Sequence, residues 1–267
     1  MDDIKNFYKT YADRILDKRV HTPYPLRRYA HQMQYRSVLD QVAPGDRVLD
    51  AGCGEGYLAV LMAKKGATVV ACDLSQPNIE AARAYAAREG VGVDFQVADL
   101  EALPFSDQAF DLVVSSHVLE HLPDFDLGLR ELMRVTKSRA VVAIPTVLNA
   151  CSLVQVGGGW FYLKGPRSFL AFFYGLARML LALVSGREGV DERYVGTAMP
   201  HVFRFPWVMQ RKARRFGYRI ARYEASTLCL PYFETLLPLV RRLDMLRAHP
   251  LFRNFGYGTT YVIEKPA

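Results

Sequence analysis

The sequence predicts a doubly wound α/β fold, in which helices cover both faces of a mostly parallel sheet. Between about residues 46 and 145, short apolar runs alternate with helical stretches. The apolar runs are rich in Val and Leu and lack polar alternation, which is typical of strands buried on both faces. Strands that alternate with helices imply right-handed crossovers and therefore a parallel sheet between two helical layers.

Local composition predicts each element in order. Strands are expected at residues 46–50, 68–73, 93–98, 110–115, 140–144, 218–223 and 259–263. Helices are expected at residues 57–65, 76–89, 127–136 and 205–216, the last of them basic.

The pattern indicates one domain, residues 1–267, with a cofactor-binding core that is interrupted twice near its end. An apolar, aromatic insertion follows Pro145, and a second irregular stretch follows the late strand at 218–223. The expected segments are a core at 40–146, a first insertion at 147–200, core again at 201–227, a second insertion at 228–256, and a last core strand at 257–265.

The first insertion contains an apolar run at residues 169–184 that includes Arg178. As a helix it would reach about 24 Å, which is shorter than the ~30 Å hydrocarbon core of a bilayer. We therefore expect a buried helix that caps the site. A helix lying in the membrane interface is the alternative.

Composition excludes several classes of protein. The chain is 51% hydrophobic, too apolar for a disordered protein. Its four cysteines are scattered, without a CxxC pair or a nearby His at ligand spacing, which argues against a disulfide scaffold and against zinc. The start is polar and acidic, unlike a signal peptide. We expect a cytoplasmic protein and no metal ion.

The positive charge is concentrated in the second half of the chain. Residues 1–150 carry 17 Lys and Arg against 20 Asp and Glu, whereas residues 151–267 carry 17 against 7. The cluster at 211–215 contains three arginines and a lysine. Such asymmetry indicates contact with phospholipid headgroups, a phosphorylated substrate or nucleic acid, or simply a solvated basic face.

A glycine-rich turn follows the first core strand, in the segment 48–56. Gly52 and Gly54 would let the backbone approach a ligand at the carboxyl edge of the sheet. Asp50 ends the strand just before this turn. Its carboxylate would repel a pyrophosphate but would hold an ammonium group, so the expected ligand carries an amine here.

Two further aspartates follow the next strands. Asp73 ends the second strand, where its carboxylate can accept both hydroxyls of a ribose. Asp99 follows the third strand and can accept a hydrogen bond from an adenine amino group. An amino-acid end, a ribose and an adenine along one sheet edge together describe S-adenosylmethionine.

These stretches resemble the class I S-adenosylmethionine-dependent methyltransferases, and among them the type 11 group that includes ubiquinone and menaquinone methyltransferases. The resemblance covers roughly residues 40–146 and returns weakly at 201–220. It rests on the segments 48–56, 70–75, 97–105 and 110–122. It implies a Rossmann-like sheet with an antiparallel last strand, N-terminal helices, and late helical insertions that form a lid.

The resemblance also implies particular contacts. Residues near the methionine part are Asp50, Ala51, Gly52, Cys53 and Gly54. The ribose contacts are Asp73 and Leu74, and the adenine contacts are Asp99 and Leu100. Tyr11 is the aromatic residue expected to cover the cofactor. Ser116 and His117 should lie near the reactive methyl group.

Methyl transfer to a hydroxyl needs a base, and histidine is the natural choice near neutral pH. His117 is the first candidate, because the loop after the fourth strand should face the methyl group. His121 lies four residues further on, and His201 could reach the site from the inserted region. Each of these histidines could instead serve only to hold its loop.

The acceptor is expected to be a hydrophobic or lipid-like small molecule. The Pro-Pro-aromatic motif of enzymes that methylate amines of DNA bases is absent, because residues 115–118 read Ser-Ser-His-Val. The first insertion is rich in aromatic residues that would desolvate such an acceptor: Trp160, Phe161, Tyr162, Phe169, Phe172, Phe173 and Tyr174.

We therefore predict methylation, on oxygen, of a hydrophobic acceptor by a cytoplasmic enzyme peripheral to an anionic membrane. A soluble secondary metabolite or sugar is the main alternative acceptor. RNA is a lesser one, because the aromatic and basic residues are not interleaved. A cofactor-binding scaffold without catalysis is the alternative from another class. The sequence leaves the oligomeric state open.

Overall fold

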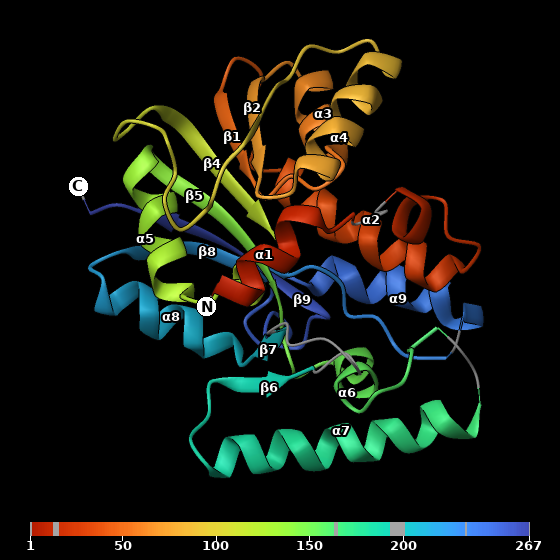
Figure 1. The fold of residues 1–267 in the computed structure, drawn as a ribbon. Helices are drawn as coiled ribbons and strands as arrows, with labels where there is room; N and C mark the ends of the chain where they lie inside the picture. The colour runs from red at the N-terminus through yellow and green to blue at the C-terminus, as the bar shows by residue number, and fades with distance from the viewer. Residues whose placement is uncertain (1, 13–15, 163–164, 193–200, 233, 267) are drawn as a thin grey trace.

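A seven-stranded sheet forms the centre of the protein (Figure 1). The computed structural model describes residues 2–12, 16–162, 165–192, 201–232 and 234–266. The strand order is β3-β2-β1-β4-β5-β9-β8. The strands are β1 (Arg47–Ala51), β2 (Thr68–Asp73), β3 (Asp94–Val97), β4 (Phe110–Ser116), β5 (Thr136–Pro145), β8 (Arg219–Ala225) and β9 (Gly258–Glu264). The first five are mutually parallel, and β9 is antiparallel to both of its neighbours. The predicted doubly wound fold with an antiparallel last strand is therefore confirmed.

Helices cover both faces of the sheet because its strands are apolar on both sides. Within β1, Val48 packs with one helical layer and Leu49 with the other. The first layer is α2 (Pro25–Leu39), α3 (Tyr57–Lys64) and α4 (Gln76–Arg88). The second is α5 (Phe125–Val135) and α8 (Pro206–Arg215). The strand order reverses at β1 and β4, which is where such sheets bind ligands.

The two insertions pack together at one end of the sheet rather than separately. The first contains α6 (Ala150–Val156), α7 (Pro166–Val184) and β6 (Gly189–Asp191), and the second contains the short helices η3 (Glu234–Leu236), α9 (Leu237–Leu243) and η4 (Asp244–Leu246). Leu26 of α2, Val154 of α6 and Val240 of α9 share one apolar cluster. β7 (Val202–Arg204) pairs with β6 in a separate sheet. α8, which packs on the central sheet, follows directly after β7.

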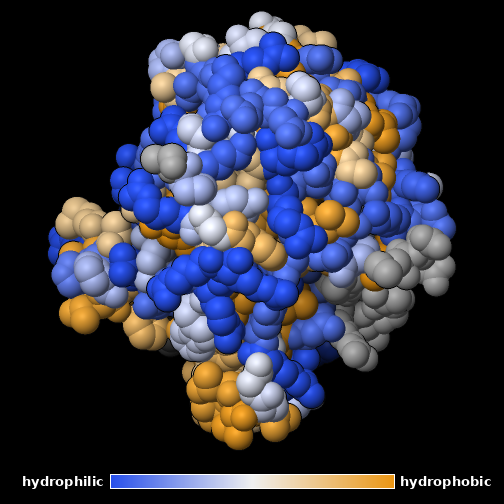
Figure 2. Space-filling model, turned by 90° about the vertical axis from the view of Figure 1, so that its left-hand side faces the viewer, coloured by the Kyte–Doolittle hydropathy of each residue, from blue (hydrophilic) through white to orange (hydrophobic). Residues whose placement is uncertain are grey.

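α7 is not the buried cap helix that the sequence predicted. Its buried residues are the small ones, Ser168, Ala171, Gly175 and Ala182. Gly175 packs so tightly that a Cβ there would lie 1.8 Å from the Leu153 carbonyl oxygen of α6. The large apolar residues point outward: Phe169, Leu170, Phe173, Tyr174, Leu180, Leu181, Leu183 and Val184. Figure 2 shows hydrophobic surface on the projection at the bottom of the molecule, where α7 lies in Figure 1.

α7 is also longer than the apolar run suggested. It has 19 residues, so it spans about 28 Å, close to the thickness of a bilayer's hydrocarbon core. Among the described residues it alone is long and apolar enough to cross a membrane. One face of α7, made of small residues, packs on α6, while large apolar residues on the opposite side are exposed.

Candidate active site

A cavity of about 640 Å³ lies at the carboxyl ends of the central strands. Most of the residues that the sequence proposed for the site line it: Tyr11, Gly52, Gly54, Asp73, Leu74, Asp99, Leu100, Ser116, His117, His121 and His201. Asp50, Ala51 and Cys53 do not line it. These three lie behind the glycine turn and are buried.

The glycine turn is held against the sheet by its own backbone. The N–H groups of Gly52 and Cys53 both donate to the Cys72 carbonyl oxygen, at 2.7 and 2.9 Å. Gly52 has φ of +85°, and a Cβ at this position would lie 2.3 Å from the Val118 side chain. Glycine is therefore required here both by conformation and by the close approach of the loop after β4.

Asp50 is a buried carboxyl group beneath this turn, with the Ala59 backbone as a hydrogen-bond partner. Its side chain is 1% exposed, and Oδ2 has no hydrogen-bond partner. Burial, together with repulsion from the nearby Asp73, raises the pKa of Asp50 to about 7. A cation brought to this end of the cavity would relieve the cost of ionising this carboxyl group.

Asp73 is fixed by three donors at the end of β2. Gly54 N–H donates to Oδ2 at 2.9 Å, while Ser75 N–H and the Asn78 side chain donate to Oδ1 at 2.9 and 3.3 Å. These bonds hold the carboxylate at the cavity wall. A carboxylate oxygen can accept more than one hydrogen bond, so the group can still receive ligand hydroxyls.

Asp99 has a partner that the sequence did not indicate. Its Oδ2 accepts from Lys5 Nζ at 2.6 Å, and the same ammonium lies 2.6 Å from Glu101 Oε2. Lys5 belongs to α1 (Asp2–Thr10), which lies across the carboxyl edge of the sheet (Figure 1). An adenine amino group at Asp99 would therefore share this carboxylate with Lys5.

His117 combines a strained backbone with a partly buried imidazole. It is a non-glycine residue with φ of +59°, held by its N–H bond to the Ala143 carbonyl oxygen at 2.8 Å. Nδ1 lies 3.3 Å from Glu120 Oε1, and Nε2 has no hydrogen-bond partner. Backbone strain of this kind is found at functional sites, and the arrangement directs one ring nitrogen to Glu120 and leaves the other for the cavity.

Glu120 is the acidic centre of a histidine cluster. It lies in η2 (Leu119–His121), and its side chain is fully buried. Burial alone would raise its pKa, but the hydrogen bond from His117 and the neighbouring His121 and His201 lower the pKa to about 2. The carboxylate is therefore ionised across the physiological range.

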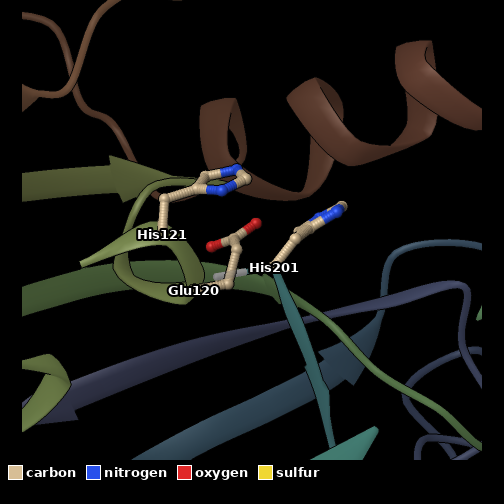
Figure 3. Close-up of side chains that lie close together, drawn as sticks. All are labelled: Glu120, His121 and His201. Carbon is tan, nitrogen blue, oxygen red and sulfur yellow. The ribbon is translucent and has the colours of Figure 1, made fainter. Parts of the chain in front are cut away.

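His121 and His201 come together from distant parts of the chain. Their rings stack with centroids 4.7 Å apart and planes at 24°. Figure 3 shows the Glu120 carboxylate beside the two imidazoles, with His201 entering just before β7. His201 Nδ1 lies 2.7 Å from Glu192 Oε2. The sequence proposed both histidines singly, without indicating that they would meet.

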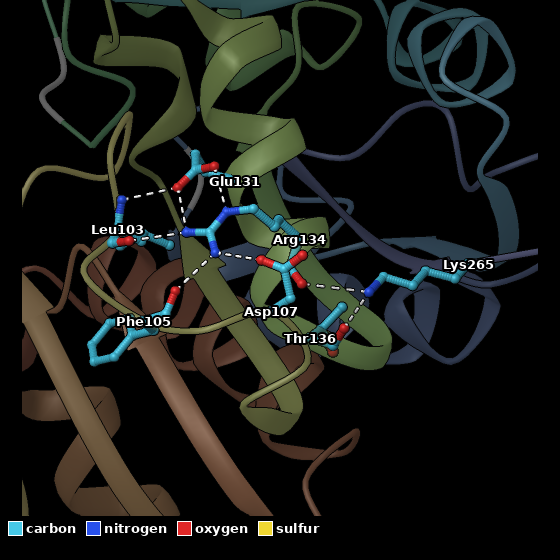
Figure 4. Close-up of polar contacts among 7 residues, drawn as sticks. All are labelled: Leu103, Phe105, Asp107, Glu131, Arg134, Thr136 and Lys265. Atoms are coloured by element: carbon cyan, nitrogen blue, oxygen red, sulfur yellow. Dashed lines mark hydrogen bonds and ion pairs between the residues drawn. The ribbon is translucent and has the colours of Figure 1, made fainter.

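The loop that follows Asp99 and Leu100 is tied to α5 (Figure 4). Arg134 donates to the carbonyl oxygens of Leu103 and Phe105, at 2.9 and 2.8 Å, and forms an ion pair with Asp107. Glu131 accepts from Leu103 N–H at 3.0 Å and hydrogen-bonds Arg134. This network fixes the loop that borders the proposed adenine pocket.

Aromatic residues form the wall opposite the glycine turn. Trp160, Phe161 and Tyr162 of the first insertion line the cavity, as the sequence predicted. Phe169, Phe172, Phe173 and Tyr174 do not line it, because α7 lies outside α6. The lid is therefore built from the segment before α7 and from α1, whose end is anchored by the Ser75 hydroxyl donating to the Tyr11 carbonyl at 2.6 Å.

The basic cluster at 211–215 lies away from the cavity, on α8. The cavity's own cations are Lys5, Lys18, Arg19 and Arg27. Arg27 donates to the Tyr162 hydroxyl at 2.9 Å and lies 4.7 Å from the centre of that ring. A phosphate or carboxylate on an acceptor would thus meet N-terminal cations rather than the predicted α8 cluster.

Sequence reasoning missed Lys5, Arg19, Arg27, Gln155 and Tyr257 as lining residues. Lys5 and the two arginines lie outside the resembling stretch, and no local periodicity marks them. Glu120 was not among the predicted site residues, although its position directly before His121 offered a signal.

Comparison with known proteins agrees with this geometry. Residues 49–144 match the methyltransferase domain family. Magnesium protoporphyrin IX methyltransferase from Synechocystis PCC 6803, solved with S-adenosylmethionine, superposes with a TM-score of 0.58 at 16% identity, over 100% of this chain and 98% of that one. An S-adenosylmethionine-dependent methyltransferase from Mesorhizobium loti gives 0.57 at 19% identity, over 88% and 98%. These likenesses show a shared fold.

Sequence relatives match less than half of the chain. The ubiquinone biosynthesis O-methyltransferases of Chelativorans sp. (strain BNC1) and Brucella anthropi are each 36% identical over 126 residues, which is 46% of this chain. The chain spans about half the length of these relatives, 50% and 51%.

The strand order, the glycine turn and the aspartates at successive strand ends lie where the sequence predicted them for a class I methyltransferase. Residues 49–144 form a methyltransferase domain, on a fold shared with solved S-adenosylmethionine-dependent methyltransferases. Part of the chain is also similar to the ubiquinone biosynthesis O-methyltransferases.

Proposed function

We propose that this protein transfers the methyl group of S-adenosylmethionine to a hydroxyl oxygen of a hydrophobic, lipid-like small molecule close to a membrane surface. The observation that carries the proposal is the single cavity that joins the cofactor edge, His117 and the aromatic wall at Trp160 to Tyr162.

The cofactor residues fit S-adenosylmethionine. The buried, unpartnered Asp50 Oδ2 suits the ammonium of the methionine part, and Gly52 and Gly54 line the cavity beside it. Asp73 suits the ribose hydroxyls, and Asp99 with Leu100 suits the adenine. We propose that Leu74 packs beside the ribose and Tyr11 covers it, while Ala51 and Cys53 shape the turn from behind.

The methyl group would then lie near Ser116 and His117. In the reaction, the acceptor oxygen attacks the methyl carbon, the carbon–sulfur bond breaks, and S-adenosylhomocysteine is released. His117 Nε2 is the proposed acceptor of the hydroxyl proton, with Glu120 at Nδ1 holding the ring in place. His121 and His201, which line the same wall, would contact the acceptor.

The acceptor end of the cavity is aromatic with a cationic edge. Phe161, Tyr162 and Tyr257 supply apolar surface, and Arg19 and Arg27 border it. Such a wall suits a ring or a chain that carries a carboxylate or phosphate away from the reacting hydroxyl. The relatives' name, ubiquinone biosynthesis O-methyltransferase, supports a quinone-like acceptor.

The exposed face of α7 supports peripheral contact with a membrane. Its large apolar side chains point outward, and Arg167 and Arg187, at either end of the helix, are exposed. Arginines beside an apolar surface suit anionic headgroups, each worth ~1 kcal/mol near the bilayer. We propose a cytoplasmic enzyme that takes its acceptor from the membrane surface.

The test is to incubate the protein with S-adenosylmethionine labelled in its methyl group and a total lipid extract, and then to separate the products. We expect label in an organic-soluble product that lacks nitrogen, and none with Asp73→Ala. Label found only in water-soluble metabolites or in RNA would contradict the proposed acceptor class.

His117 is tested with the acceptor identified in that experiment. His117→Gln keeps a hydrogen-bonding side chain but cannot take the proton, so turnover should fall by about 10²–10⁴-fold while cofactor affinity stays close to that of the wild type. If His117→Gln retained most of the activity, the histidine would only hold its loop.

A further inference from the structure

Two of the four cysteines meet where the two insertions pack together. Cys151 lies at the start of α6 in the first insertion, and Cys229 lies before η3 in the second, 78 residues later in the chain. Their sulfur atoms are 3.0 Å apart. A disulfide bond is about 2.05 Å long, so the sulfurs need to approach each other by only about 1 Å to form one.

One side chain fixes the backbone at both cysteines. Asn149 caps α6 by accepting from the Cys151 N–H at 2.8 Å, and its amide nitrogen donates to the Cys229 carbonyl oxygen at 3.1 Å. Both cysteines are fully buried, in an apolar cluster that they share with Phe161 and Tyr257. The two thiols are therefore held against each other by the packing of the insertions.

Within the described residues, the other two cysteines have no such contact with each other. Cys53 and Cys72 are also buried and free, but the Cys53 thiol donates to the Gly54 carbonyl oxygen, at 3.6 Å. Burial alone therefore does not bring sulfur atoms together in this protein. Cys151 and Cys229 are the pair whose positions favour a covalent bond.

We propose that Cys151 and Cys229 form a reversible disulfide bond when the protein meets hydrogen peroxide. One thiolate attacks a peroxide oxygen, which gives a sulfenic acid and, with the proton of the thiol, water. The second thiol attacks the sulfenic sulfur, so that the sulfur–sulfur bond forms and a second water leaves. Overall, two thiols are oxidised to one disulfide while one hydrogen peroxide is reduced to two waters. A dithiol reductant reverses the bond by thiol–disulfide exchange.

The burial of the pair determines when this bond can form. Burial raises the pKa of the Cys151 thiol, so the reactive thiolate is scarce while the insertions are packed together. Peroxide therefore reacts during brief local openings of the cluster. The bond then prevents the next opening, because it joins α6 to the segment before η3.

The bond acts on the acceptor side of the cavity, and this part of the inference rests on the proposed function. Phe161 and Tyr257 line the cavity and pack with the two cysteines. The second insertion also holds the aromatic wall directly, because Tyr232 N–H donates to the Phe161 carbonyl oxygen at 2.8 Å. A large hydrophobic acceptor would have to displace this wall to enter or leave. Oxidation should therefore slow turnover without changing the affinity for S-adenosylmethionine, whose proposed contacts lie in the core.

The test first measures the bond without the acceptor. The protein is reduced with dithiothreitol, freed of the reductant and incubated with hydrogen peroxide. Intact-mass measurement should show the loss of two hydrogen atoms per chain, and peptide mapping without reductant should link Cys151 to Cys229. Cys151→Ser and Cys229→Ser should form no such link. Cys72→Ala, which removes a buried free cysteine elsewhere, is the matched control and should form the link like the wild type. Calorimetry with S-adenosylmethionine, run on every variant, shows which are folded.

Two further measurements separate the outcomes. Oxidation should raise the melting temperature of the wild type by about 5–15 °C and leave that of Cys151→Ser unchanged. Transfer of label from S-adenosylmethionine to the lipid extract should slow on oxidation and recover with dithiothreitol, and Cys151→Ser should not respond.

Each failure has its own meaning. A peptide map that links Cys53 to Cys72, or that finds sulfinic acid without a link, overturns the disulfide site and leaves the proposed function standing. A linked protein with unchanged turnover overturns the effect on the acceptor side. A protein that forms the link but transfers no label even when reduced overturns the proposed function alone.

Discussion

Asp50 makes cofactor affinity depend on pH, and its replacement gives a sharp test of the cofactor site. In the cofactor-free protein, burial first and repulsion from Asp73 second raise the pKa of Asp50 to about 7. The carboxyl group is therefore mostly neutral below that pH. The proposed contact with the cofactor's ammonium requires the ionised form, so binding must first remove a proton from Asp50.

The size of the effect follows from this pKa. At pH 5.5 only about 3% of the Asp50 side chains are ionised, so S-adenosylmethionine affinity should be about 30-fold lower than with Asp50 fully ionised. Above pH ~8 the cofactor's own α-amino group loses its proton, since such groups titrate at about 7.7–8.0. Affinity should therefore pass through a maximum between pH 7 and 8, about 15- to 20-fold above its value at pH 5.5. At pH 7 Asp50 releases about half a proton and the cofactor amine takes up about 0.1–0.2, so roughly a third of a proton is released per cofactor bound.

The assay is calorimetry across pH 5.5–8.5 in buffers with different ionisation enthalpies, which reports proton release directly. Asp50→Asn retains the shape of the side chain but cannot titrate, so it should bind more weakly at pH 7.5 and lose the acidic limb. Asp73→Asn is the comparison variant: it should weaken binding at every pH and retain the acidic limb, moved to lower pH because the repulsion that raises the pKa of Asp50 is removed. An acidic limb that persists unchanged in Asp50→Asn would show that another group is responsible and refute the reasoning.

Three further predictions concern the loop, the acceptor and the membrane. Arg134→Met should lower the free energy of unfolding by about 1.5–3 kcal/mol, because it leaves the Leu103 and Phe105 carbonyls without their charged donor. Urea denaturation measures this change, and an unchanged free energy of unfolding would mean that water replaces the guanidinium. Arg27→Met should raise the KM for acceptors with a carboxylate or phosphate about 10-fold or more, while the affinity for S-adenosylmethionine stays unchanged. A KM equal to that of the wild type would show that Arg27 does not contact the acceptor. Leu181→Glu, on the exposed face of α7, should reduce flotation with phosphatidylglycerol vesicles, whereas Met245→Glu, exposed on η4, should not. Equal flotation of both variants would place the membrane contact elsewhere.

The sequence by itself determined the sheet and the cofactor side of the site. Strands such as β1 and β2 are apolar runs whose length and lack of alternation are local properties. Parallel strands end at a common edge, so Asp73 and Asp99, which follow successive strands, had to lie along one side of the cavity. Gly52 was predictable because the turn after β1 needs a residue without a side chain.

Only the tertiary structure decided which distant residues meet around the acceptor. His121 and His201 stack, and Lys5 reaches Asp99, through contacts between segments about 80 and 94 residues apart. Such contacts depend on how the insertions and α1 fold back over the sheet, which no local periodicity encodes. The orientation of α7 was missed for the same reason. Large apolar residues occur on several sides of this helix, so only the packing of its small residues against α6 decides which face is buried.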